Sequence, residues 1–136
     1  MAVTTGRYGD IAHGLLRIVA GFVFWQHGAQ KLMGWMGGVG PDGGTAELMS
    51  LFGVAGILEF FGGILIVLGL LTRPVAFILA GEMAFAYFTR HLPQSFWQME
   101  NGGEPATLYA FIFLFFAAAG AGAFSLDRFL AARRKA

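Results

Sequence analysis

The sequence contains no cysteine among its 136 residues. This absence excludes disulfide bonds, thiolate metal ligands and thiol redox chemistry by the chain itself. Charged residues are also scarce, at 12%, whereas soluble domains contain about 25%. Apolar residues make up 57% of the chain. A soluble core of this size could not bury so much apolar surface, so the composition favours a protein that a lipid bilayer solvates.

Two further features are missing. The net charge is only +1, so there is no charge excess that would attract nucleic acid. The glycine-rich stretches lack the strand–loop–helix pattern of a phosphate-binding loop. A cleavable signal peptide is not expected either, because Asp10, His13 and Arg17 interrupt the uncharged run that it needs. The first apolar segment is therefore predicted to be a retained helix.

Four apolar segments are long enough to cross a bilayer, which takes about 20 residues in a helix. They cover residues 10–33, 49–71, 74–91 and 105–126. The sequence between them is glycine-rich and polar at 34–48, a tight turn before Pro74, and a polar loop at 92–104. We predict an all-α, integral membrane four-helix bundle that forms a single domain over residues 1–136.

The basic residues predict the orientation of this bundle. With four spans both termini lie on one side, and that side is rich in basic residues: Arg7, Arg73, Arg128, Arg133, Arg134 and Lys135. The other side carries only Lys31 and Arg90. Because cytoplasmic loops are enriched in Lys and Arg, both termini are predicted to be cytoplasmic. The expected location is the inner (cytoplasmic) membrane of a bacterium, as a multi-pass protein.

Several ionisable residues lie at membrane depth, where a charge is costly unless it faces the protein interior. Arg17 shares one helical face with His27 and Lys31. Glu59 and Glu82 lie near the middle of the second and third segments, at similar depth by the ~1.5 Å rise per residue of a helix. We expect an Arg17–Glu59–Glu82 cluster. An outer polar layer is expected from His27, Lys31, Arg90 and His91, capped by Glu100 and Glu104.

Two interpretations of this cluster stay open. Buried ion pairs can fix helix register without any chemistry. Alternatively, since one arginine cannot compensate two carboxylates, one glutamate keeps a proton and relays it. His27 and His91 could in principle bind a haem or a metal, but no ligand spacing in the sequence is diagnostic. We expect no haem and no metal, and histidines that line an outer cavity.

Several stretches resemble the DoxX family of small bacterial membrane proteins, in the same order over residues 10–128. They are residues 16–18 (LRI), 27–32 (HGAQKL), 56–63 (GILEFFGG), 68–73 (LGLLTR), 82–83 (EM), 100–104 (ENGGE), 108–109 (LY), 120–122 (GAG) and 125–127 (SLD). The resemblance implies four membrane helices. It also implies a link to quinone-dependent oxidoreductases or to resistance to oxidative and thiol stress, in some relatives through assembly with soluble redox enzymes.

The resemblance also implies candidate site residues. The family's motif residues correspond to Glu59 and Glu82 and to Arg17, His27, Gln30, Lys31, Arg90, Glu100, Asn101, Glu104 and Tyr109. Their burial at membrane depth makes Glu59 and Glu82 the candidates for proton handling, and the others are the candidates for substrate binding. No cofactor motif is evident in the sequence. A quinone is the small molecule that the resemblance favours.

Two functional hypotheses follow. The first is a quinone-linked redox protein, or the membrane subunit of an oxidoreductase complex, that receives electrons from a soluble partner or directly from a substrate. The second is a non-enzymatic module, either an anchor for soluble enzymes or a transporter of small solutes. A four-helix transporter would need to form a homo-oligomer, for which the small residues at 117–122 provide a helix-packing face.

Overall fold

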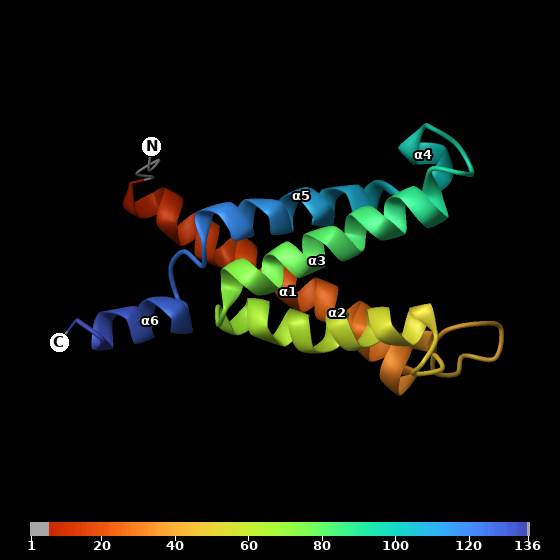
Figure 1. Ribbon diagram of the computed structural model, residues 1–136, viewed down its shortest axis with the longest axis horizontal. Coiled ribbons are helices and arrows are strands. Elements are labelled where there is room, and N and C mark those ends of the chain that lie inside the picture. Colours follow the sequence, from red (N-terminus) through yellow and green to blue (C-terminus); the bar gives the residue numbers. More distant parts are fainter. Residues whose placement is uncertain (1–5, 136) are drawn as a thin grey trace.

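The structure is a computed structural model that describes residues 6–135, and within this range it is all-α. Four long helices run side by side: α1 (Arg7–Met33), α2 (Leu51–Leu68), α3 (Thr72–Ala86) and α5 (Glu104–Ala119) (Figure 1). Shorter elements are η1 (Trp35–Gly37), the π-helical η2 (Tyr87–His91), α4 (Gln98–Asn101) and α6 (Leu126–Arg133). The single β-bridge among the described residues joins Val39 to Gly44 in a loop.

The four long helices pack as two close pairs. α1 lies along α2, and α3 lies along α5. α2 and α3 share a smaller interface, and the backbones of α1 and α5 stay farther apart and are joined by side chains such as Phe24 and Tyr109. Glycines bring α1 and α2 together: a Cβ added at Gly63 would lie 2.8 Å from the Cα of Trp25, and one at Gly28 would overlap the backbone of Phe60. This confirms that the small residues beside Glu59 permit a close approach of a neighbouring helix.

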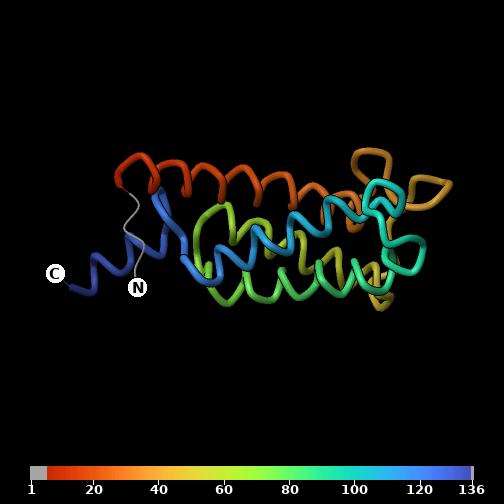
Figure 2. Tube along the Cα trace, turned by 90° about the horizontal axis from the view of Figure 1, so that it is seen from above, coloured from red at the N-terminus to blue at the C-terminus, as the bar shows by residue number. Residues whose placement is uncertain are grey.

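The two ends of the molecule differ. At one end, called here the α6 end, lie the start of α1, the turn between α2 and α3, and α6 (Figure 2). At the other, called here the loop end, lie residues 34–50 and the segment 92–103 that contains α4 (Figure 1). A buried apolar core fills the middle, with Phe24, Ile66, Leu79, Phe113 and Phe116 almost fully enclosed.

The helix boundaries depart from the predicted ones most clearly at the end of the fourth segment. The helix predicted over 105–126 ends at Ala119. Gly120 follows with a φ of 89°, a left-handed conformation that favours glycine and ends the helix. The chain then resumes as α6, where the hydroxyl of Ser125 accepts a hydrogen bond from the backbone N–H of Arg128. The predicted long helix is therefore corrected to α5, a loop and a separate short helix.

Large apolar side chains lie on the outside of the molecule as well as inside it. Phe22, Phe77 and Phe111 are among many that are exposed, and soluble monomers rarely display extensive apolar surface. Among the described helices, α2 is the one that is both long and apolar enough to cross a membrane, and α5 is apolar but shorter. The exterior is consistent with contact with lipid.

Candidate functional site in a cavity at the loop end

A cavity of about 650 Å³ lies between the long helices, in the half of the molecule nearer the loop end. Its volume falls in the range of ~300–1,000 Å³ that is typical of small-molecule sites. Most of its wall is apolar, and α1, α2, α3 and α5 all contribute to it. The polar or ionisable side chains in the wall come from His27, Lys31, Glu59, Glu82, Thr89, Arg90, His91 and Tyr109.

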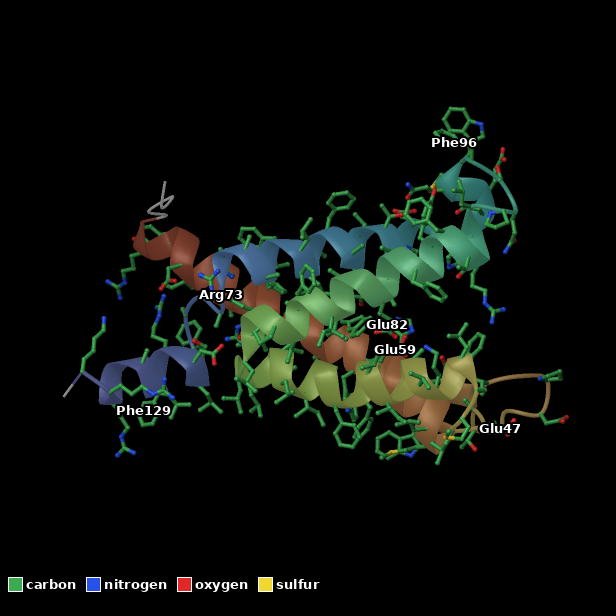
Figure 3. All side chains as sticks on the ribbon, in the orientation of Figure 1. Glu47, Glu59, Arg73, Glu82, Phe96 and Phe129 are labelled. Atoms are coloured by element: carbon green, nitrogen blue, oxygen red, sulfur yellow. The ribbon has the colours of Figure 1, made fainter. Side chains whose placement is uncertain are left out.

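An ion pair and an unpaired carboxyl group lie together in this cavity. The Nζ of Lys31 donates a hydrogen bond of 2.5 Å to Oε2 of Glu59, and both side chains are largely buried. Both oxygens of Glu82 are buried and have no hydrogen-bond partner among residues 6–135. Figure 3 shows Glu59 and Glu82 facing each other across the space between α2 and α3. Two buried carboxyl groups therefore lie close to one ammonium group, which is bonded to that of Glu59.

The antiparallel arrangement of α1 and α2 explains the pair. Lys31 belongs to the last turn of α1, and Glu59 lies in the third turn of α2 counted from the loop end. The long side chain of Lys31 reaches along the interface of the two helices toward Glu59. The ring of Phe52 lies 5.9 Å from the Nζ of Lys31. Burial in an apolar wall strengthens such an electrostatic contact, because little water screens it.

Aromatic and imidazole rings also belong to the polar wall. His27 packs edge-on to Tyr109, with ring centroids 6.2 Å apart, and Phe24 lies against both. His91, on η2, has its Nδ1 2.9 Å from the backbone oxygen of Asn101. His27 and His91 thus line one cavity, as expected. Among residues 6–135 no three His, Asp or Glu side chains gather in a group that could hold a metal ion.

Arg17 lies elsewhere, at the α6 end. Its guanidinium uses all five of its N–H groups on backbone carbonyl oxygens, at 2.6–2.9 Å. These acceptors belong to the last turn of α2 and to the loop after α5: Ile66, Val67, Ala121, Ala123 and Phe124. The expected Arg17–Glu59–Glu82 cluster is therefore corrected to one of Lys31 with Glu59 and Glu82.

Four other predicted site residues do not line the cavity. Gln30 points toward the carbonyl of Met36, at 3.5 Å. Glu100 accepts a hydrogen bond from the hydroxyl of Ser95, and Glu104 is exposed at the first turn of α5. Asn101 is buried and holds the adjoining loop: its amide donates to the carbonyl of Ser95 and accepts from the backbone N–H of Gly103. Asn101 thus supports His91 from outside the cavity.

Sequence reasoning did not identify the apolar residues of the cavity wall, among them Phe52 and Gly81. The ring of Phe52 lies 5.1 Å from the Cζ of Arg90 and so joins α2 to η2 at the loop end. Gly81 precedes Glu82 and faces open space, because a Cβ added there would meet no atom within 4 Å. The position of Gly81 next to a carboxylate in the middle of a helix could have indicated a place in the site. Nothing in the sequence distinguishes Phe52 from the other phenylalanines, of which there are fifteen in all.

Known proteins are similar to this chain in sequence. A family model described as DoxX matches residues 13–92. A Haemophilus influenzae protein described as uncharacterized is 45% identical over 125 residues, which cover 89% of this chain and 92% of that protein. The "Inner membrane protein YqjF" of Escherichia coli is 30% identical, over 89% of this chain and 93% of its own length. The "Putative oxidoreductase CatD" of Bacillus subtilis is 31% identical over 64% of this chain and 65% of its own. No solved structure matches the chain.

Proposed function

Since the chain belongs to the DoxX family and is a membrane protein, we propose that it is a multi-pass protein of the bacterial inner membrane whose cavity binds the ring of a quinone. In this proposal the four long helices form the membrane bundle and both termini are cytoplasmic. The observation that carries the proposal is the buried, unpartnered carboxyl group of Glu82 beside the Lys31–Glu59 pair in an apolar cavity.

The polar groups suit the two carbonyl oxygens of a quinone ring. Lys31 has three N–H donors, of which Glu59 accepts one, so the ammonium group can also donate to a ring oxygen. A charged Glu82 without any partner would be costly in this apolar wall. We propose that Glu82 carries a proton and donates a hydrogen bond to the second ring oxygen. Tyr109 and His27, whose rings meet edge-on, line the cavity beside this position.

The proposed reaction is the reduction of the quinone to a quinol, which takes up two electrons and two protons. The electrons come from a reduced partner protein, such as a soluble enzyme with its own redox cofactor. Glu82 gives a proton to the ring oxygen that it contacts, the Lys31–Glu59 pair gives one to the other ring oxygen, and both groups regain a proton from water at the loop end. Buried carboxyl groups at membrane depth are typical proton relays.

The test is quinone binding and reduction by the purified protein in lipid nanodiscs, with the Glu82→Gln variant. Glutamine has nearly the same shape but cannot release a proton. We expect Glu82→Gln to bind a decyl-substituted benzoquinone within about threefold of the unmodified protein and to lose its proton-coupled reduction by the partner. The matched control is Glu47→Gln, which changes an exposed glutamate in the loop 34–50.

The result that would overturn the proposal is the absence of saturable quinone binding by the unmodified protein. In that case the same buried charges would favour the non-enzymatic alternative, an anchor for soluble enzymes or a transporter of small solutes. Proton-coupled reduction that survives unchanged in Glu82→Gln would remove Glu82 from the proposed relay while leaving the binding site in place.

A further inference from the structure

We infer that the cavity opens sideways toward the lipid, between α2 and α3, and that its ligand enters by this route with an apolar tail left between the two helices. The inference rests on the proposed quinone site and names the class of ligand: an amphipathic, membrane-dissolved molecule with a polar head and a long apolar tail. Four residues, Val54, Ile78, Gly81 and Phe85, form this opening and are called here the α2–α3 window.

The window residues belong to the cavity wall and to the outer surface at once. Val54 is 48% exposed, Ile78 54% and Phe85 53%, yet all three line the cavity. Gly81 lies among them with no side chain and no atom that a Cβ would meet within 4 Å. Since every member is apolar or lacks a side chain, the opening suits lipid and offers little to water.

The packing of the helices explains why the opening lies here. α2 and α3 are joined by a short turn at the α6 end, where Gly69 takes a left-handed conformation with a φ of 65°. From that turn they diverge toward the loop end (Figure 1), and their shared interface is much smaller than those of the α1–α2 and α3–α5 pairs. The cavity occupies the space that this divergence leaves.

Side chains fill the space between α1 and α5. There the ring of Phe24 packs 5.1 Å from that of Tyr109 and 4.7 Å from that of Phe113. Toward the loop end, Arg90 lies over the ring of Phe52 at 5.1 Å, and Thr89 and Arg90 line the cavity and are exposed. The loop end therefore offers polar groups to water, whereas the lateral opening carries no polar side chain and is the route that suits an apolar tail.

The geometry also sets the position of the ligand. A head that enters through the window meets Glu82, one residue from Gly81 on α3, and then the Lys31–Glu59 pair. The tail stays between Val54 and Phe85 and covers apolar surface that would otherwise face lipid chains. A ligand without a tail leaves the window unfilled and loses those contacts.

Gly81 provides a direct test, because added side chains there extend into the window without meeting the rest of the fold. The measurement is binding to the full chain in nanodiscs of two probes, a decyl-substituted benzoquinone and the corresponding benzoquinone without a tail. We expect Gly81→Phe to weaken binding of the decyl probe at least tenfold. The matched control is Gly44→Phe, the same substitution at a glycine of the loop 34–50 that lies outside the cavity and also has no atom within 4 Å of an added Cβ, and it should change binding less than twofold. The tail-less probe should bind the unmodified protein at least tenfold more weakly than the decyl probe.

A second measurement does not depend on any substitution. A decyl benzoquinone with a photoreactive diazirine at the end of its tail is irradiated with the unmodified protein, and its adducts are located by mass spectrometry. Adducts on α2 and α3 around Val54, Ile78 and Phe85 support lateral entry. Adducts confined to 34–50 or 92–103, or decyl binding that Gly81→Phe leaves unchanged, overturn it while the quinone site stands. If neither probe binds saturably, the proposed function itself fails, and the inference with it.

Discussion

Arg17 and Lys31 are two basic residues on one face of one helix, and their surroundings give them different tasks. Arg17 is fully buried and donates to five backbone carbonyl oxygens, of which that of Ile66 also accepts from the backbone N–H of Gly69. Lys31 faces the cavity and pairs with Glu59. A planar guanidinium with five fixed donors suits the first task, and a compact ammonium on a flexible chain suits the second.

We expect Arg17→Lys to destabilise the protein without changing its cavity. Lysine has three donors in place of five, so at least two buried carbonyls lose their partner, and each unmade hydrogen bond of this kind costs about 1–3 kcal/mol. The predicted loss is about 2–6 kcal/mol on that basis. It would be measured by thermal unfolding in detergent, followed by tryptophan fluorescence. An unchanged melting temperature with lost quinone binding would return Arg17 to the ligand site.

The depth of each charged residue in the membrane can be predicted from the sequence more closely than the residue that it pairs with. α1 and α2 are antiparallel and are connected at the loop end. A residue of α1 that lies toward the α6 end must therefore lie beside the last turns of α2. This register places Arg17 beside Val67, not beside Glu59. The expected pairing required the long Arg17 side chain to reach toward Glu59 from a position nearer the cytoplasm, and the structure shows it bonded to the last turn of α2 instead.

At the scale of helices, glycine divides the bundle into tight and open interfaces. Gly28 and Gly63 lie where α1 and α2 approach each other, and an added Cβ at either position would overlap the backbone of the neighbouring helix. Gly81 lies at the diverging interface of α2 and α3 and has free space around it. The same residue type therefore has opposite effects on packing in the two places.

Alanine substitutions should separate these two kinds of glycine. Gly28→Ala forces the backbone of Phe60 to move, and overpacking of this kind costs about 1–3 kcal/mol. Gly81→Ala meets no neighbour and should stabilise α3 by up to about 1 kcal/mol, because alanine favours a helix more than glycine does. Thermal unfolding of both variants under the same conditions is the measurement. Equal melting temperatures would contradict the division.

Sequence patterns predicted the long helices better than their ends. Runs of apolar residues and the glycine-rich loops located α1, α2, α3 and α5. Most of the predicted helix boundaries lie within a few residues of the observed ones. The end of α5 was missed because residues 120–125 carry no charge, and only Gly120 and Gly122 mark the loop. The carbonyl groups of that loop are satisfied by Arg17, a contact across about a hundred residues that no local pattern contains.

At the scale of the whole molecule, the distribution of basic residues predicts how it lies in the membrane. The α6 end carries Arg73 and Arg128, together with Arg133 in the last turn of α6. At the loop end Lys31 is paired with Glu59, and Arg90 is accompanied by exposed acidic side chains. Because Lys and Arg are retained on the cytoplasmic side, the α6 end is expected in the cytoplasm and the cavity nearer the opposite face.

The absence of cysteine makes this orientation simple to test, because any introduced thiol is the only one in the chain. Asp42→Cys places a thiol in the exposed loop 34–50, and Ala132→Cys places one on the exposed side of α6. We expect a membrane-impermeant maleimide, added to cells with a permeabilised outer membrane, to label the Asp42→Cys variant and to label the Ala132→Cys variant only after the inner membrane is opened. The reverse pattern would place the proposed quinone head near the cytoplasmic face, and Glu82 would then draw its protons from the cytoplasm instead of from the opposite side.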